Sequence, residues 1–274
     1  MNLVPMGYLL RRALKHKYAV PALNIANLET IKNVLIAANK LRAPVIIAVY
    51  HGDAYNCGFQ TIVEIVRCLG EGMDLEVAVH LDHGSSLEQV VKAIRAGFTS
   101  VMYDGSALPI EENINNTKQV VEIARYAGVT VEGEIGALGE HSLTDPDEAV
   151  RLAQTGIDCL AVAIGNAHGW YKGECRLDFE RLGEIAKRTN IPIVLHGGTG
   201  IPRDQIQKAI AMGITKVNFG TVLRDRFVNG VKAFITANPD KTEIREILAG
   251  GAKPMQEAIG ECISLCMAEG KLEV

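Results

Sequence analysis

The chain has 274 residues, of which 48% are hydrophobic and 22% are charged, and its formal net charge is −4 at pH 7. These values are ordinary for a globular protein and give no basic footprint for nucleic acid. No uncharged apolar run is long enough to span a bilayer, and the six cysteines include no CxxC pair, which is typical of reduced thiols. We therefore expect a soluble cytoplasmic protein with neither nucleic acid nor a membrane as partner.

Short apolar runs alternate with segments whose apolar residues recur every three or four positions. This pattern is typical of parallel strands joined by amphipathic helices. Strands are predicted over 18–25, 44–50, 75–82, 100–104, 130–135, 159–164, 192–196 and 216–219. Helices between them are predicted over 28–41, 87–96, 110–127, 146–155, 179–188 and 202–212. Most of these helices are followed by a glycine or an asparagine, which favours helix termination.

Eight strands with intervening helices predict an α/β protein, a (β/α)8 TIM barrel, formed by residues 1–274 as a single domain. An open doubly wound sheet is disfavoured because the first strand is not followed by a glycine-rich turn. Helices are also predicted over 221–236 and 243–269, after the last strand. The second of these would be an extra C-terminal helical arm that covers the barrel or contacts another subunit.

Three histidines stand at the ends of predicted strands, where the active sites of such barrels lie. His83, His168 and His196 are each followed by a glycine, which allows a ligand to approach the backbone closely. Each alone is best explained as a hydrogen-bonded structural histidine. Three that converge at one rim favour a catalytic Zn²⁺ with an open fourth position.

Carboxylates and further histidines accompany this set. Asp82 precedes a proposed metal ligand and is predicted to act as an acid or base, with helix capping as the alternative. Glu134, and less strongly Glu132, is a candidate metal ligand or neighbour of the metal, although charge compensation inside the barrel explains it equally well. Strand alternation places His80 inside the barrel as a structural residue. His51 is a weaker site candidate at a strand end.

Glycines and small polar residues follow the seventh and eighth predicted strands. The turn from His196 to Gly200 and the step from Asn218 to Thr221 occupy the usual phosphate-binding position of these barrels. Backbone amides and hydroxyl groups there can hold a dianion, although tight turns need glycine in any case. The sequence therefore predicts a small phosphorylated substrate.

The series of motifs resembles a known family, the class II metal-dependent aldolases that cleave fructose or tagatose 1,6-bisphosphate. The resemblance rests on PALN (21–24), HLDHG (80–84), SVMYDGS (100–106), VEGEIG (131–136), LAVAIGNAHGWY (160–171), VLHGGTG (194–200) and TKVNFGT (215–221). It implies a lyase that splits a ketose 1,6-bisphosphate or a ketose 1-phosphate reversibly into dihydroxyacetone phosphate and an aldehyde.

The resemblance also implies the role of each site residue. The three histidines would bind zinc, with Glu134 near the metal, and Asp82 would pass the proton to and from the aldol oxygen. A monovalent cation, Na⁺ or K⁺, would lie near Gly169 and Lys172. The assembly is expected to be a homodimer or homotetramer. The substrate-binding residues would be Asn24, Gly169, Lys172, Gly197, Thr199, Asn218 and Thr221.

Two departures from the family pattern bear on catalysis and on the substrate. The loop after the fifth strand is short, and Glu140 is the only near substitute for a family glutamate that transfers the proton on the dihydroxyacetone phosphate carbon. The segment 248–255 contains no arginine where bisphosphate-specific members carry one. We therefore hypothesise an aldehyde other than glyceraldehyde 3-phosphate, with Lys253, Arg224 or Arg226 as the alternative source of charge.

Three other functions are weighed against this one. The same mechanism would serve a different aldehyde half, such as malonate semialdehyde released from 6-phospho-5-dehydro-2-deoxygluconate, and the sequence does not decide between the two. A metal-dependent hydrolase would commonly need His-x-His on the first strand, which reads ALNIA (22–26) instead. A non-catalytic barrel that binds a sugar phosphate is the third alternative.

Overall fold

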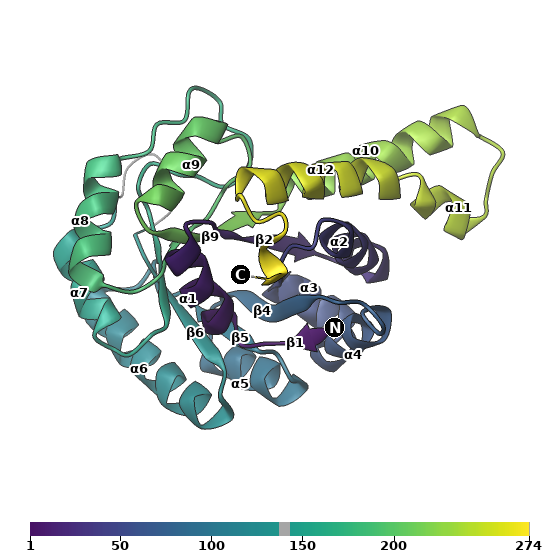
Figure 1. Cartoon of the computed structure of the whole chain (residues 1–274). Helices are drawn as coiled ribbons and strands as arrows, with labels where there is room; N and C mark the ends of the chain where they lie inside the picture. Colours follow the sequence, from purple (N-terminus) through teal and green to yellow (C-terminus); the bar gives the residue numbers. More distant parts are fainter. Residues whose placement is uncertain (137–142, 274) are drawn as a thin grey trace.

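The computed structural model describes residues 1–136 and 143–273, and a closed parallel barrel forms its centre (Figure 1). Each barrel strand pairs with the next, and the ring closes where Ala22 pairs with Asn218. The predicted TIM barrel is confirmed. Its strands are β2 (Val20–Ile25), β3 (Val45–Tyr50), β4 (Glu76–Gly84), β5 (Ser100–Tyr103), β6 (Thr130–Ile135), β7 (Cys159–Val162), β8 (Ile193–Leu195) and β9 (Ile214–Phe219).

Helices surround the barrel, and side-chain caps fix where several of them begin. Asn27 accepts a hydrogen bond from the Thr30 amide, and Ser86 accepts one from the Gln89 amide. Within the described residues, no helix has the length and apolar character that a membrane crossing needs. The predicted helices appear as α2 (Leu28–Lys40), α5 (Leu87–Ala96), α6 (Ile110–Ala127), α7 (Pro146–Ala153), α8 (Phe179–Thr189) and α9 (Arg203–Ala211).

Four elements near the N-terminus and after β3 were not predicted. They are β1 (Asn2–Leu3), α1 (Met6–His16), α3 (His51–Cys57) and α4 (Phe59–Leu69). β1 pairs with β4 at Glu76 and Val77, whereas β5 begins to pair with β4 only at His80. β1 therefore covers a length of strand edge that would otherwise be open. α1 contacts β2, β4 and β9 and buries Met6 at the N-terminal end of the barrel.

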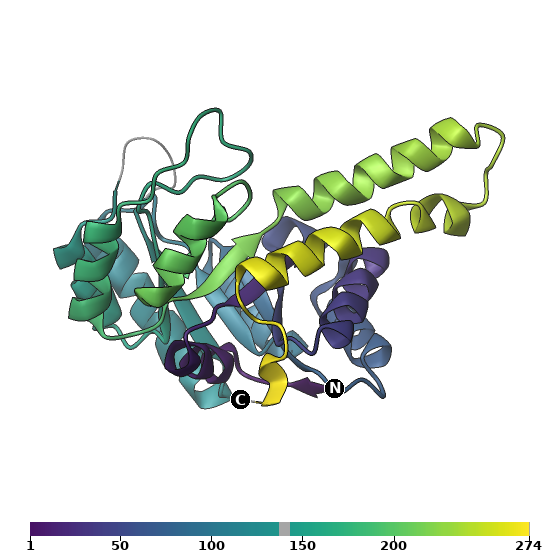
Figure 2. The same ribbon diagram turned by 45° about the horizontal axis from the view of Figure 1, so that its top comes forward.

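A helical arm extends from the barrel and is built from α10 (Thr221–Ala237), α11 (Ile244–Ala249) and α12 (Ala252–Leu265) (Figure 2). The predicted single helix over 243–269 is wrong, because the chain breaks at Gly250 and Gly251. A Cβ on Gly250 would lie 2.6 Å from Phe234 Cβ, and one on Gly251 would lie 2.6 Å from Phe227 Cδ2. The arm therefore turns where only glycine allows it to approach α10. A short 3₁₀ helix, η1 (Lys271–Glu273), follows α12.

The inside of the barrel contains a buried polar cluster beneath the strand ends. Lys216 Nζ donates a hydrogen bond to Glu132 Oε2 at 2.7 Å, and both side chains are fully buried. His80 lies beside them, with Nδ1 2.7 Å from Ser100 Oγ, and burial together with the charge of Lys216 lowers its pKa to about 3. His80 is therefore the neutral, structural histidine that the alternation predicted.

Candidate active site

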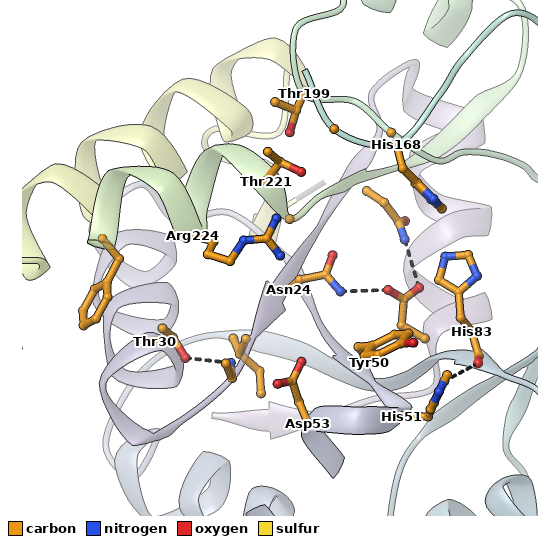
Figure 3. Close-up of a pocket in the computed structure, with 18 of the residues that line it drawn as sticks. Asn24, Thr30, Tyr50, His51, Asp53, His83, His168, Thr199, Thr221 and Arg224 are labelled. Carbon is orange, nitrogen blue, oxygen red and sulfur yellow. Dashed lines mark hydrogen bonds between the residues drawn. The ribbon is translucent and has the colours of Figure 1, made fainter. Parts of the chain in front are cut away.

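A cavity of about 720 Å³ opens at the C-terminal ends of the barrel strands (Figure 3). His196 and Glu134 are buried at this rim and do not line the cavity itself. Lys172 is exposed and does not line it, and Glu140 lies outside the described residues. The predicted site residues that do line the cavity are Asn24, Asp82, His83, His168, Gly169, Gly197, Thr199, Asn218 and Thr221.

An irregularity at the end of β4 sets the position of His83. The register between β4 and β5 shifts between Leu81 and Gly84, and the φ of His83 is 51°, in the left-handed region. Bulges of this kind redirect a side chain at the rim of a barrel, and a non-glycine residue in this conformation indicates local strain. His51 Nδ1 lies 2.8 Å from the His83 carbonyl oxygen and helps to hold this turn.

The three predicted histidines converge on one point. His83 Nε2 lies 3.2 Å from His196 Nδ1, and the ring centroids of His83 and His168 are 5.1 Å apart. Each of the three rings offers a nitrogen within 4.8 Å of the others. This separation allows the three rings to share a single ion.

Carboxylates hold the outer nitrogens of two of these rings. His83 Nδ1 lies 2.7 Å from Asp104 Oδ2, and His196 Nε2 lies 2.8 Å from Glu132 Oε1. Because a carboxylate only accepts hydrogen bonds, each ring donates outward, and in the neutral form of both rings each turns a lone pair toward the other. Two facing lone pairs, each backed by a carboxylate, are the arrangement of metal-binding histidines. The residues present therefore fit a divalent cation such as zinc.

The same surroundings shift the pKa values of His83 and His168 in opposite directions. Burial by itself lowers the pKa of His83, but the hydrogen bond that it donates to Asp104 and the charges of Asp82 and Glu134 raise it to about 9. Burial and the neighbouring histidines lower the pKa of His168 to about 4. His83 therefore carries a second, additional proton when no cation is bound, and a metal ion bound to its inward nitrogen would displace that proton.

A second group of ligand atoms overlaps the first. His83, Asp104 and Glu134 also bring one ligand atom each within 4.8 Å of one another. Glu134 Oε2 is buried and has no hydrogen-bond partner among the described residues. Burial and the charge of Asp104 raise the pKa of Glu134 well above its ordinary value. A buried carboxyl oxygen without a hydrogen-bond partner is stabilised by a proton or by a nearby cation. Glu134 is therefore a candidate member of the metal centre.

Asp82 is held as an anion beside the histidines. Asn24 Nδ2 donates to Asp82 Oδ2 at 2.7 Å, and Asn218 Nδ2 donates to Asp82 Oδ1 at 3.1 Å (Figure 3). Burial would raise the pKa of Asp82, but the electrostatic effect of His83, His196 and Lys216 outweighs it and lowers the pKa below its ordinary range. The carboxylate is therefore fixed in direction and ionised, as a general base must be.

The turn after β8 and the start of α10 form the opposite wall of the cavity. Thr199 Oγ1 accepts a hydrogen bond from the Val222 amide at 3.3 Å, and Thr221 is the first residue of α10. Tyr171 Oη accepts from the Ala167 amide at 3.0 Å and donates to the Gly197 carbonyl at 3.3 Å. The loop after β7 is thereby tied to a helix N-terminus, where backbone amides favour an anion.

Comparison with known proteins identifies the family. A family model described as fructose-bisphosphate aldolase class-II matches residues 4–271. The chain belongs to this family. A fructose-bisphosphate aldolase of Geobacillus stearothermophilus is 44% identical over 272 residues, which cover 94% of this chain and 95% of that protein. The D-tagatose-1,6-bisphosphate aldolase subunit GatY of Klebsiella oxytoca is 39% identical, with 99% and 100% covered.

A solved structure supports the same assignment. The crystal structure of the YdjI aldolase from Escherichia coli K12 matches with a TM-score of 0.89 at 33% identity, covering 99% of this chain and 100% of that one. The predicted resemblance to the class II aldolases is therefore confirmed, and with it the assignment of this aldolase to the lyases. The family is generally zinc-dependent, in agreement with the ligand geometry.

Several residues that line the cavity were not predicted. Tyr50 and Asp53 come from the end of β3 and from α3, and Arg224 of α10 was only one of three alternative cations. The strand-end rule named His51, which lines the cavity, and it could also have found Tyr50 at the end of the same predicted strand. Asp53 could be predicted as a site residue only if it were known that α3 begins directly after the strand.

Proposed function

We propose that this class II aldolase cleaves a ketose 1,6-bisphosphate, of the fructose or tagatose type, or a ketose 1-phosphate, reversibly into dihydroxyacetone phosphate and an aldehyde. The observation that carries the proposal is the pair His83 and His196, each backed by a carboxylate and both close to the anchored Asp82. This arrangement combines a cation site with a general base at the mouth of one barrel.

His83, His168 and His196 are the residues proposed to hold zinc, with Glu134 close to them. When bound, zinc would act as a Lewis acid that places positive charge next to the substrate oxygens. Asp104 and Glu132 accept from the outer nitrogens of His83 and His196, so the inward nitrogens would face the metal once it displaces the additional proton of His83.

Asp82 is proposed to take the proton of the C4 hydroxyl during cleavage and to return it during condensation. Its two amide partners, Asn24 and Asn218, leave the carboxylate ionised and fix its orientation in the cavity. Asn218 Oδ1 has no hydrogen-bond partner among the described residues, and it can accept from a substrate hydroxyl. The proton on the dihydroxyacetone phosphate carbon is assigned to Glu140 by family resemblance alone.

The phosphate of the dihydroxyacetone phosphate half is proposed to bind at the turn after β8. Gly197, Thr199 and Thr221 line the cavity there, at the N-terminus of α10, and Gly169 lines it from the loop after β7. Lys172 is assigned to the same half by family resemblance, as is a monovalent cation, Na⁺ or K⁺, near Gly169.

The helical arm supports a homodimer or homotetramer as the assembly. It extends away from the barrel (Figure 2) and exposes Ile235 and Ile244, which are 46% and 69% accessible to solvent. Exposed apolar residues on a projecting element favour burial against another subunit. All six cysteines are free thiols, which supports a cytoplasmic location.

The test is release of dihydroxyacetone phosphate, coupled to NADH oxidation, from a panel of ketose 1-phosphates and 1,6-bisphosphates with zinc or with chelator. Chelator-sensitive release from any of them supports the proposal. Release only from 6-phospho-5-dehydro-2-deoxygluconate would move the assignment to malonate semialdehyde. Zinc-loaded protein that releases dihydroxyacetone phosphate from no substrate would indicate a barrel that only binds sugar phosphates.

A further inference from the structure

Part of the cavity, the distal region between α3 and the first turns of α10, has no role in the proposed function. Figure 3 shows the side chain of Asp53 pointing into it from α3 and that of Arg224 pointing into it from α10. Its remaining walls are largely apolar and include Ile25, Phe227 and Met255.

Arg224 is the only lysine or arginine among the described residues that line the cavity. Its guanidinium makes no hydrogen bond or ion pair with any residue in the described part of the chain, so its donors are available. The two other cations considered from the sequence lie elsewhere. Arg226 is 3.9 Å from Glu261 and Lys253 is 4.0 Å from Glu257, and neither lines the cavity.

Asp53 sets the charge of this distal region. Burial raises the pKa of Asp53 above its ordinary value, and the positive charge of Arg224 opposes the rise. An ionised Asp53 cancels the single positive charge of Arg224. The region therefore contains the guanidinium donors of Arg224 and the carboxylate acceptor of Asp53, whose charges together sum to about zero.

A second phosphate would fit poorly between these groups. A phosphate monoester carries about −1.5 to −2 charges at pH 7 and would meet one guanidinium whose charge a carboxylate already offsets. A hydroxyl group both donates and accepts, so hydroxyls on a short carbon chain can satisfy Arg224 and Asp53 together. The apolar side chains around them suit the carbon chain and not a hydrated dianion.

We propose that Asp53 and Arg224 form the subsite for the aldehyde half, and that Asp53 is a specificity residue that selects an unphosphorylated, hydroxyl-bearing aldehyde. The substrate class is accordingly a ketose 1-phosphate, in preference to a ketose 1,6-bisphosphate. This inference rests on the proposed aldolase function and names the substrate class of that same site.

The experiment compares kcat/KM for a ketose 1-phosphate with that for the matching 1,6-bisphosphate, in both the fructose and tagatose series, using the zinc-loaded full chain. The wild type is expected to favour the 1-phosphate by about tenfold or more. Asp53→Asn should shift this ratio about tenfold toward the bisphosphate, whereas Asp53→Glu, which keeps the charge, should preserve it. Arg224→Gln should lower kcat/KM for the bisphosphate.

Two control variants repeat the charge changes outside the cavity. Asp74→Asn removes a carboxylate that pairs with Arg42 at the surface, and Arg226→Gln removes a guanidinium two residues from Arg224 on the same helix. Both should leave the ratio unchanged. Circular dichroism and melting temperature confirm that each variant is folded.

A wild type that prefers the bisphosphate, or an Asp53→Asn ratio equal to that of the wild type, overturns this inference while the aldolase function stands. A loss of dihydroxyacetone phosphate affinity in Arg224→Gln, measured with dihydroxyacetone phosphate alone, would assign Arg224 to the first phosphate and also overturns it. Zinc-loaded wild type that releases dihydroxyacetone phosphate from no ketose overturns the proposed function and, with it, this inference.

Discussion

The buried pair of Lys216 and Glu132 gives a quantitative test of the barrel interior. Both side chains are fully buried, and among the described residues the 2.7 Å hydrogen bond between them is the only one that Lys216 Nζ makes to a carboxylate. In Lys216→Met, the Glu132 carboxylate would stay buried beside His80, His196 and Cys159 but without the charge of the lysine. Removing one partner of such a pair typically costs about 3–5 kcal/mol of unfolding free energy. We expect a loss in this range.

The double variant Lys216→Met with Glu132→Gln isolates the cost of the uncompensated charge. Because it removes both charges, it should recover most of the stability lost in the single variant. Equilibrium urea unfolding followed by far-UV circular dichroism measures these differences, with chelator present so that bound zinc does not contribute. A single variant within about 1 kcal/mol of the wild type, or a double variant no more stable than the single, would refute the reasoning.

The same pair predicts how the stability depends on pH. Burial raises the pKa of Glu132, but the charge of Lys216 and the hydrogen bond to His196 outweigh it and lower the pKa well below its ordinary value. Its contribution to stability is therefore fully present above the unfolded value of about 4.3 and is lost as the pH falls toward the folded pKa. The difference in stability between wild type and Lys216→Met should shrink in acid, and a difference that grows would contradict this sign.

Two further variants test the catalytic base and the anion-binding turn. Asp82→Asn keeps the shape of the side chain but removes the base, so kcat for ketose cleavage should fall by about 10²–10⁴. The zinc content of the variant, measured by elemental analysis, should equal that of the wild type. Unchanged turnover would exclude Asp82 as the base. Gly197 has φ of 66°, and a Cβ there would collide with the Ala167 carbonyl oxygen, whereas Gly128 has φ of 67° and open space around its Cβ. Gly197→Ala should therefore lose about 1–3 kcal/mol more than Gly128→Ala in urea unfolding, and equal losses would show that the turn relaxes freely.

The barrel could be predicted from the sequence because each strand is a short apolar run bounded by polar or glycine residues. α1 carried the same kind of signal, since Met6, Leu9, Leu10 and Ala13 follow a helical spacing and are all buried. It was missed because it precedes the first strand and belongs to no βα repeat. The break at Gly250 depends on close approach to α10, a tertiary contact that local periodicity does not report.

The site could be predicted as far as strand ends determine it. His83, His168 and His196 were found because parallel strands bring their C-terminal ends to one rim. The carboxylate behind each ring was harder to assign, because Glu132 reaches His196 from a strand two positions away in the barrel. Asp53 and Arg224 come from elements far apart in sequence, and only the folded arrangement brings them to one cavity.

The measurement that tests the central claim most directly is exchange of the C3 proton of dihydroxyacetone phosphate in D₂O, followed by NMR, because it needs no knowledge of the aldehyde. We expect exchange with zinc-loaded protein, loss of exchange with chelator, and recovery when zinc is added back. Zinc-loaded, folded protein that binds dihydroxyacetone phosphate but exchanges no proton would contradict the account of this site as the active site of an aldolase.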